Sequence, residues 1–201
     1  EAQLFYEAQV LIGRFYRLEL VAHDLYLVQQ LIPMCYLPRF THLLRCHPPA
    51  LVRKASELFD SVTMAVAEKL YDIGELDPER ASFPRRAGGA GLRNQTRTSH
   101  GAYFAGCSAG MDSSAFQDDP DLSLLLPSLD SDPGVGEIPM LTALRDARAS
   151  CIQLGAEDYF ADLSLSDAVR RASKKGAQKS ITAQVERRAV EVFFPEVAPE
   201  C

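Results

Sequence analysis

A glycine-rich turn flanked by arginines restricts the fold of this chain more than any other stretch. Gly88, Gly89 and Gly91 lie within four residues. Glycine allows positive φ angles and close approach of backbone segments, and Pro84 fixes φ just before the turn. This stretch cannot lie inside a helix, so we predict a tight structural turn between two helix-like segments.

The same stretch is basic within an acidic chain. The 201 residues carry 27 Asp and Glu against 21 Lys and Arg, a net charge of −6. Between Arg80 and Met111 there is no acidic residue, whereas the window contains Arg80, Arg85, Arg86, Arg93 and Arg97. This local excess indicates a phosphate-bearing partner or an acidic patch, and the overall charge excludes uniform wrapping of nucleic acid.

Charge is segregated further along the chain. Residues 112–137 contain seven acidic residues and no Lys or Arg, and they are rich in Ser, Pro and Gly. We interpret them as a flexible acidic linker with at most one helical turn around Leu124. A second basic stretch follows at residues 170–188, which a solvated helix face would also explain.

Apolar residues at three- and four-residue spacing predict helices along most of the chain. The predicted ranges are 2–20, 21–32 with a break or kink at Pro33 and Pro38, 49–70 with a stop at Gly74, 98–105 capped by Thr98 and ended by Gly106 or Gly110, 141–154 with a stop at Gly155, a helix capped by Ser164 or Ser166 that runs through Ala172, and 181–192 ended by Pro195. No stretch alternates apolar and polar residues as a strand would.

These patterns predict an all-α fold, an irregular multi-helix bundle with a Gly-rich turn and a long acidic linker. We divide it into a helical region at 1–110, the linker at 111–137 and a C-terminal helical segment at 138–201. Five scattered cysteines indicate reduced thiols in an intracellular protein, cytoplasmic or nuclear. No apolar run reaches the roughly 18 residues of a membrane span, so we expect no membrane partner. The start at Glu1, within a helical pattern, is compatible with a fragment.

Residues 106–110 match the G-x-S-x-G string of a hydrolase nucleophile elbow around Ser108. That elbow requires a preceding strand and a later histidine, and all four histidines precede Ser108. His42 and Cys46 lack the second ligand pair of a zinc site, so we expect a buried thiol and surface histidines there. Asp118 and Asp119 lie in the linker. We therefore predict no catalytic residue, metal or cofactor.

Nucleotide-binding loops do not explain the glycine turn. A P-loop requires Gly-Lys-Ser/Thr, and a dinucleotide fingerprint requires glycine at the position of Asn94. Two interpretations remain open: a purely structural role in helix packing, and contact with a nucleic-acid backbone.

Several motifs occur in a familiar order. They are Pro38 to Pro49, Phe59-Asp60, Leu76, Phe83 to Arg93, and His100 to Gly106. Together they resemble the region that follows the polymerase palm in reverse transcriptases of non-LTR retrotransposons, and residues 177–181 resemble its tail less specifically. Ala90 stands where that family usually has Leu, and Gly106 where it often has Ser.

The resemblance implies a thumb-like segment of an RNA-directed DNA polymerase that holds the template–primer duplex. The palm and its metal-binding Asp pair have no counterpart here, so we expect no polymerase activity from this chain. Arg85, Arg86, Arg93 and Arg97 are the expected phosphate contacts, and Pro84 and the three glycines shape the turn. The expected partners are an RNA–DNA hybrid or another nucleic-acid backbone, and the missing palm and fingers. The alternative is a helical protein–protein interaction module without a nucleic-acid role.

Overall fold

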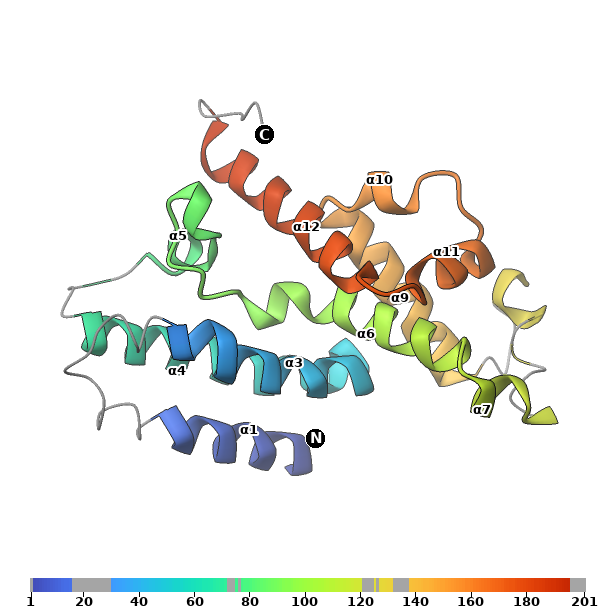
Figure 1. Ribbon diagram of the computed structural model, residues 1–201, viewed down its shortest axis with the longest axis horizontal. Helices are drawn as coiled ribbons and strands as arrows, with labels where there is room; N and C mark the ends of the chain where they lie inside the picture. Colours follow the sequence, from blue (N-terminus) through green and yellow to red (C-terminus); the bar gives the residue numbers. More distant parts are fainter. Residues whose placement is uncertain are drawn as a thin grey trace. The chain divides into compact units, whose positions relative to one another are not determined.

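The all-α class is confirmed (Figure 1). The computed structural model describes residues 2–15, 30–71, 75, 77–120, 125, 127–131 and 138–195. Within these ranges all regular structure is helical, without a strand. No helix among the described residues is long and apolar enough to cross a membrane.

The chain forms two compact units. Unit 1 comprises residues 1–44, 50–99 and 190–201, and unit 2 comprises residues 45–49 and 100–189. The main division falls inside two helices, α6 (Gln95–Met111) and α12 (Ala177–Phe193), so each contributes several residues to both units. The end of α3 and the first residue of α4 also belong to unit 2. The sequence pattern groups residues 100–110 with the N-terminal region. They belong to unit 2 because Tyr103 and Phe104 lie in its core.

Unit 1 contains most of the N-terminal helices. These are α1 (Ala2–Phe15), a π-helix η2 (Ile32–Tyr36), the start of α3 (Leu37–Cys46), α4 (Pro49–Tyr71), α5 (Pro78–Ser82), a 3-10 turn η3 (Arg85–Ala87) and the start of α6. The rings of Phe40 and Phe59 stack in its core with centroids 4.3 Å apart. The rest of the predicted helix 2–20, most of the predicted helix 21–32, and the stop at Gly74 lie outside the described residues.

Pro33 and Pro38 distort the helix without ending it. The widened π-helical turn runs over residues 32–36, and the Leu37 N–H donates to the carbonyl of Ile32, five residues earlier. A turn of this kind accommodates a residue that lacks an N–H. The expected kink is therefore a π-helical turn, and α3 continues through Pro38.

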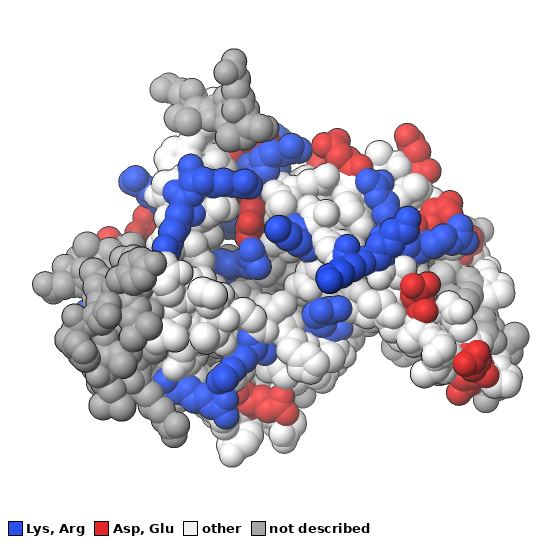
Figure 2. Space-filling view, viewed as in Figure 1, with Lys and Arg blue, Asp and Glu red and all other residues white. Residues whose placement is uncertain are grey.

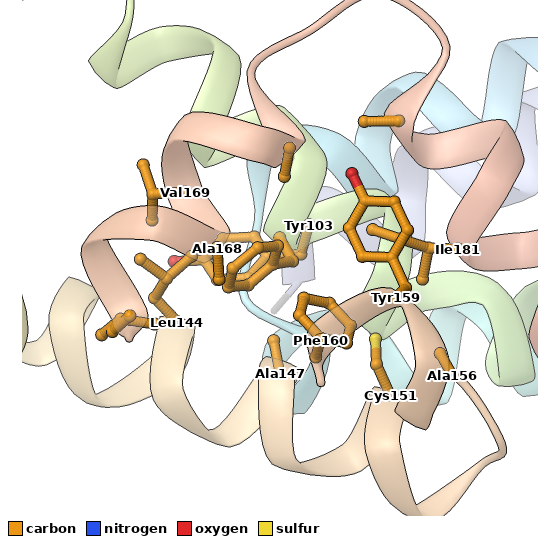
Figure 3. Packing of buried hydrophobic residues seen from close by; sticks show 14 of the residues in the cluster. Tyr103, Leu144, Ala147, Cys151, Ala156, Tyr159, Phe160, Ala168, Val169 and Ile181 are labelled. Atoms are coloured by element: carbon orange, nitrogen blue, oxygen red, sulfur yellow. The ribbon is translucent and has the colours of Figure 1, made fainter. Parts of the chain in front are cut away.

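Unit 2 is built around α6 and the C-terminal helices. Its further elements are α7 (Ser114–Gln117), η4 (Pro127–Asp130), α9 (Pro139–Gln153), α10 (Glu157–Phe160), α11 (Leu165–Ala172) and the larger part of α12. Figure 3 shows Phe160 within the core, near Ala147 and Cys151 of α9. The Phe160 ring meets that of Phe104 edge to face, with centroids 5.2 Å apart.

Two further expectations differ from the structure. The short helix predicted at 98–105 is the 17-residue α6, which passes through Gly101, Gly106 and Gly110. In the acidic region, η4 packs into the core of unit 2: Leu129 is 3% exposed, and Arg145 donates to its carbonyl. The buried side chain of Leu129 and its hydrogen-bonded carbonyl hold this part of the acidic region against the rest of unit 2. The turn predicted around Leu124 lies outside the described residues.

Candidate nucleic-acid interface

The glycine-rich turn is held by its own backbone. The N–H groups of Ala90 and Leu92 both donate to the carbonyl of Ala81, at 3.2 and 3.1 Å, and Gly91 donates to Phe83 at 2.9 Å. Phe83 and Leu92 anchor the two sides of the turn, with exposed fractions of 0% and 1%. The turn is therefore a folded loop closed on the end of α5.

Two kinds of constraint explain the glycines. Gly88 and Gly91 have φ angles of 77° and 75°, a region that L side chains rarely adopt. At Gly89 the constraint is steric, because a Cβ atom would overlap the carbonyl oxygens of Phe83 and Arg80. A chain with side chains at these positions could not close the turn in the same way.

The first turn of α6 is capped by a residue from another helix. Asp60 of α4 accepts hydrogen bonds from the N–H groups of Gln95 and Thr96, at 2.8 and 3.0 Å, and from the Thr96 hydroxyl at 2.8 Å. Asn94 accepts from the N–H of Arg97 at 2.7 Å. Three N–H groups that a helix start leaves unpaired are thus satisfied, and the end of the glycine turn is fixed to α4.

Burial raises the pKa of Asp60, and the hydrogen bonds from Thr96 and Gln95 and the charge of Arg97 act against this rise. Sequence reasoning did not assign Asp60 or Asn94 to the site. For Asn94 a signal existed, since Asn is a preferred N-cap residue. For Asp60 none existed in local spacing, because its partners lie 35 and 36 residues away.

Arg97 is used inside the fold. Its guanidinium pairs with the carboxylate of Glu79, and its side chain is only 14% exposed. Residues 80–97 contain no acidic residue, but in the fold they contact the carboxylates of Asp60 and Glu79. The ion pair between Arg97 and Glu79 connects α6 to α5 across the glycine turn.

The other predicted arginines lie on the surface. Arg85 and Arg86 follow Pro84 in η3, Arg93 follows the turn, and all three side chains are exposed. Arg80, in α5, is exposed as well. The structure thus presents a loop with a fixed backbone and several guanidinium groups around it. Such groups can bind phosphate oxygens through paired N–H donors.

The remaining motifs have structural explanations. Ser108 is fully buried in the last turn of α6, and its hydroxyl donates to the carbonyl of Phe104 at 2.7 Å, so residues 106–110 do not form a strand–turn–helix elbow. Cys35 and Cys46 are exposed, which corrects the expectation of a buried thiol near His42. Among the described cysteines the buried thiol is that of Cys151, whose pKa is raised to about 12 by burial. Among the described residues no cluster of His, Cys, Asp or Glu could hold a metal ion.

Comparisons of the chain with protein-family models, curated protein sequences and solved structures found no match. The resemblance to reverse transcriptases therefore rests on the motifs alone.

Proposed function

We propose that residues 80–97 contact the phosphate backbone of a nucleic acid, as part of a non-catalytic helical segment similar to the region after the palm of a retrotransposon reverse transcriptase. The contact groups are Arg85, Arg86 and Arg93. Arg97, which is paired with Glu79, positions the start of α6.

The observation that carries this proposal is the combination of a fixed turn and exposed arginines. A turn whose backbone is already closed loses little further conformational entropy when its side chains bind a ligand. Phosphate contacts from Arg position a nucleic acid without reading its sequence. This supports a duplex-holding role rather than base recognition.

The test is binding of the full chain to a fluorescein-labelled RNA–DNA hybrid of about 20 base pairs, followed by fluorescence anisotropy between about 50 and 200 mM salt. The triple variant Arg85→Gln, Arg86→Gln and Arg93→Gln should bind more weakly. The slope of log K against log salt should fall by about one unit for each lost phosphate contact.

A charge-matched control is available in the same unit. Arg39, Arg53 and Lys54 are exposed on α3 and α4, and their replacement by Gln changes the net charge by the same amount. If both triple variants lower the slope equally, the effect is one of net charge and the proposal fails. It fails too if the turn variant binds like the unaltered chain.

Protein binding is a second candidate, favoured by an apolar surface in unit 1. Tyr6 and Val10 of α1 are 61% and 41% exposed. Ala2 and Phe5 of α1 and Leu51, Lys54 and Ala55 of α4 line a depression of about 300 Å³. Exposed apolar side chains gathered in this way are typical of interaction surfaces. If the Tyr6→Ser and Val10→Ser double variant abolishes capture of a partner while hybrid binding is absent in all variants, this second function replaces the first.

A further inference from the structure

Residues 168–185 are a second basic segment, and it lies in unit 2, apart from the glycine turn in the sequence. It contains Arg170, Arg171, Lys174, Lys175 and Lys179 and no acidic residue. The structure folds it into the last turns of α11, a short connection, and the first turns of α12. Gly176, with a φ of 92°, lets the chain change direction between the two helices.

The two faces of this helix pair differ in chemistry. Ala168, Val169 and Ala172 of α11 and Ala177 and Ile181 of α12 are buried in the core of unit 2. The five cationic side chains are all exposed. Figure 2 shows Lys and Arg side chains gathered where Figure 1 places α11 and the start of α12. The core packing therefore fixes a helix pair whose outer side is basic.

Among the described residues, only part of this charge is compensated by acidic or aromatic side chains. Arg170 pairs with Asp167 at 3.2 Å, and the guanidinium of Arg171 lies over the ring of Tyr159, 4.6 Å from its centroid. Within the described part of the chain, Lys174, Lys175 and Lys179 make no ion pair with an acidic side chain. Three ammonium groups within six residues repel one another unless an anionic partner neutralises them.

We propose that this α11–α12 basic surface binds the phosphodiester backbone of a nucleic acid, independently of the arginines in residues 80–97. Lysines are flexible point charges that suit a row of phosphates better than one fixed anion. They read no base sequence, so binding should be insensitive to sequence. The observations favour nucleic acid over an anionic membrane, because no large apolar side chain of residues 165–185 is exposed to insert into lipid.

The experiment uses the full chain and two probes. One is a fluorescein-labelled RNA–DNA hybrid of about 20 base pairs, and the other is vesicles of phosphatidylcholine with phosphatidylserine. The test variant carries Lys174→Gln, Lys175→Gln and Lys179→Gln, and the control carries Arg39→Gln, Arg53→Gln and Lys54→Gln. Circular dichroism of each variant checks that the helices are retained.

The test variant should bind the hybrid roughly a hundredfold more weakly than the control at 0.1 M salt, with a salt slope lower by about three units. Equal binding by the test and control variants overturns the proposal. So does a loss of vesicle binding with unchanged hybrid binding, which would assign the surface to membranes. The result for Arg85, Arg86 and Arg93 is read from a different variant, so the two proposals can fail separately.

Discussion

Asp60 and the α6 residues that it caps lie 35 and 36 positions apart in the sequence. The carboxylate accepts hydrogen bonds from two N–H groups that have no partner within their own helix, because they lie at its start. We expect Asp60→Ala to lower the free energy of unfolding by about 1–3 kcal/mol, because it leaves both donors unpaired. Urea unfolding followed by circular dichroism measures the difference.

Asp118→Ala provides the control, since Asp118 is an exposed carboxylate after α7. It should change stability by less than about 0.5 kcal/mol. Equal effects of the two substitutions would contradict a capping role for Asp60.

His100 should give the stability of the fold a pH dependence. Burial lowers its pKa from the ordinary value of 6.5, and its Nδ1 is buried without a hydrogen-bond partner among the described residues. The unfolded chain therefore takes up a proton at higher pH than the folded chain does. Stability should be full above about pH 6.5 and should fall as the pH drops from there through the lower pKa of the folded state.

Thermal unfolding between about pH 5 and 7 checks this, with His100→Gln as the comparison. The variant should show a flatter pH dependence over this range. A profile as steep as that of the unaltered chain would assign the effect to other groups.

At the scale of elements, two glycines should respond in opposite ways to the same substitution. A Cβ at Gly89 would overlap the carbonyl of Phe83, whereas a Cβ at Gly110, within α6, meets nothing within 4 Å. We expect Gly89→Ala to destabilise the protein by more than about 1 kcal/mol, and Gly110→Ala to stabilise it by up to about 1 kcal/mol. The denaturant midpoints of the two variants show whether each substitution raises or lowers stability. If Gly89→Ala left the stability unchanged, the turn could open at no cost.

Most helices could be predicted from the sequence because their apolar residues follow a single stripe. The Pro49 start of α4, the Ser164 cap of α11 and the stop of α9 before Gly155 are local signals of this kind. Helix α6 gives no such stripe, because residues 101–105 are all buried, so that apolar and small residues occur on every side. Its cap from Asp60 is distant in sequence, and local patterns cannot show it.

The candidate site was predicted only in part for the same reason. The exposure of Arg85, Arg86 and Arg93 agrees with a surface role, and the spacing of the glycines indicated the turn. The partner of Arg97 could not be found from spacing, since Glu79 lies 18 residues away across the turn. Local charge counts therefore overstate the cationic excess around residues 80–97.

At the scale of the whole molecule, each unit has its own aromatic centre. Phe59 stacks on Phe40 in unit 1, and Phe160 meets Phe104 in unit 2. Truncation of a buried phenylalanine to Ala costs about 3–5 kcal/mol. We expect Phe160→Ala to raise hydrogen exchange in α9 and α11 first, and Phe59→Ala to raise it first in α3 and α4. Mass spectrometry of peptides from the exchanged chain measures the protection of each helix. A uniform loss of protection over both units in both variants would mean that the units unfold as one.

The cap that Asp60 provides also bears on the order of folding. Helix α4 has a local apolar pattern and can form early, whereas the first turn of α6 lacks partners for two N–H groups until α4 lies beside it. Closing a loop of this length costs entropy before the cap forms. We therefore expect Asp60→Ala to speed unfolding far more than it slows folding, so that the start of α6 joins the native structure after the folding transition state.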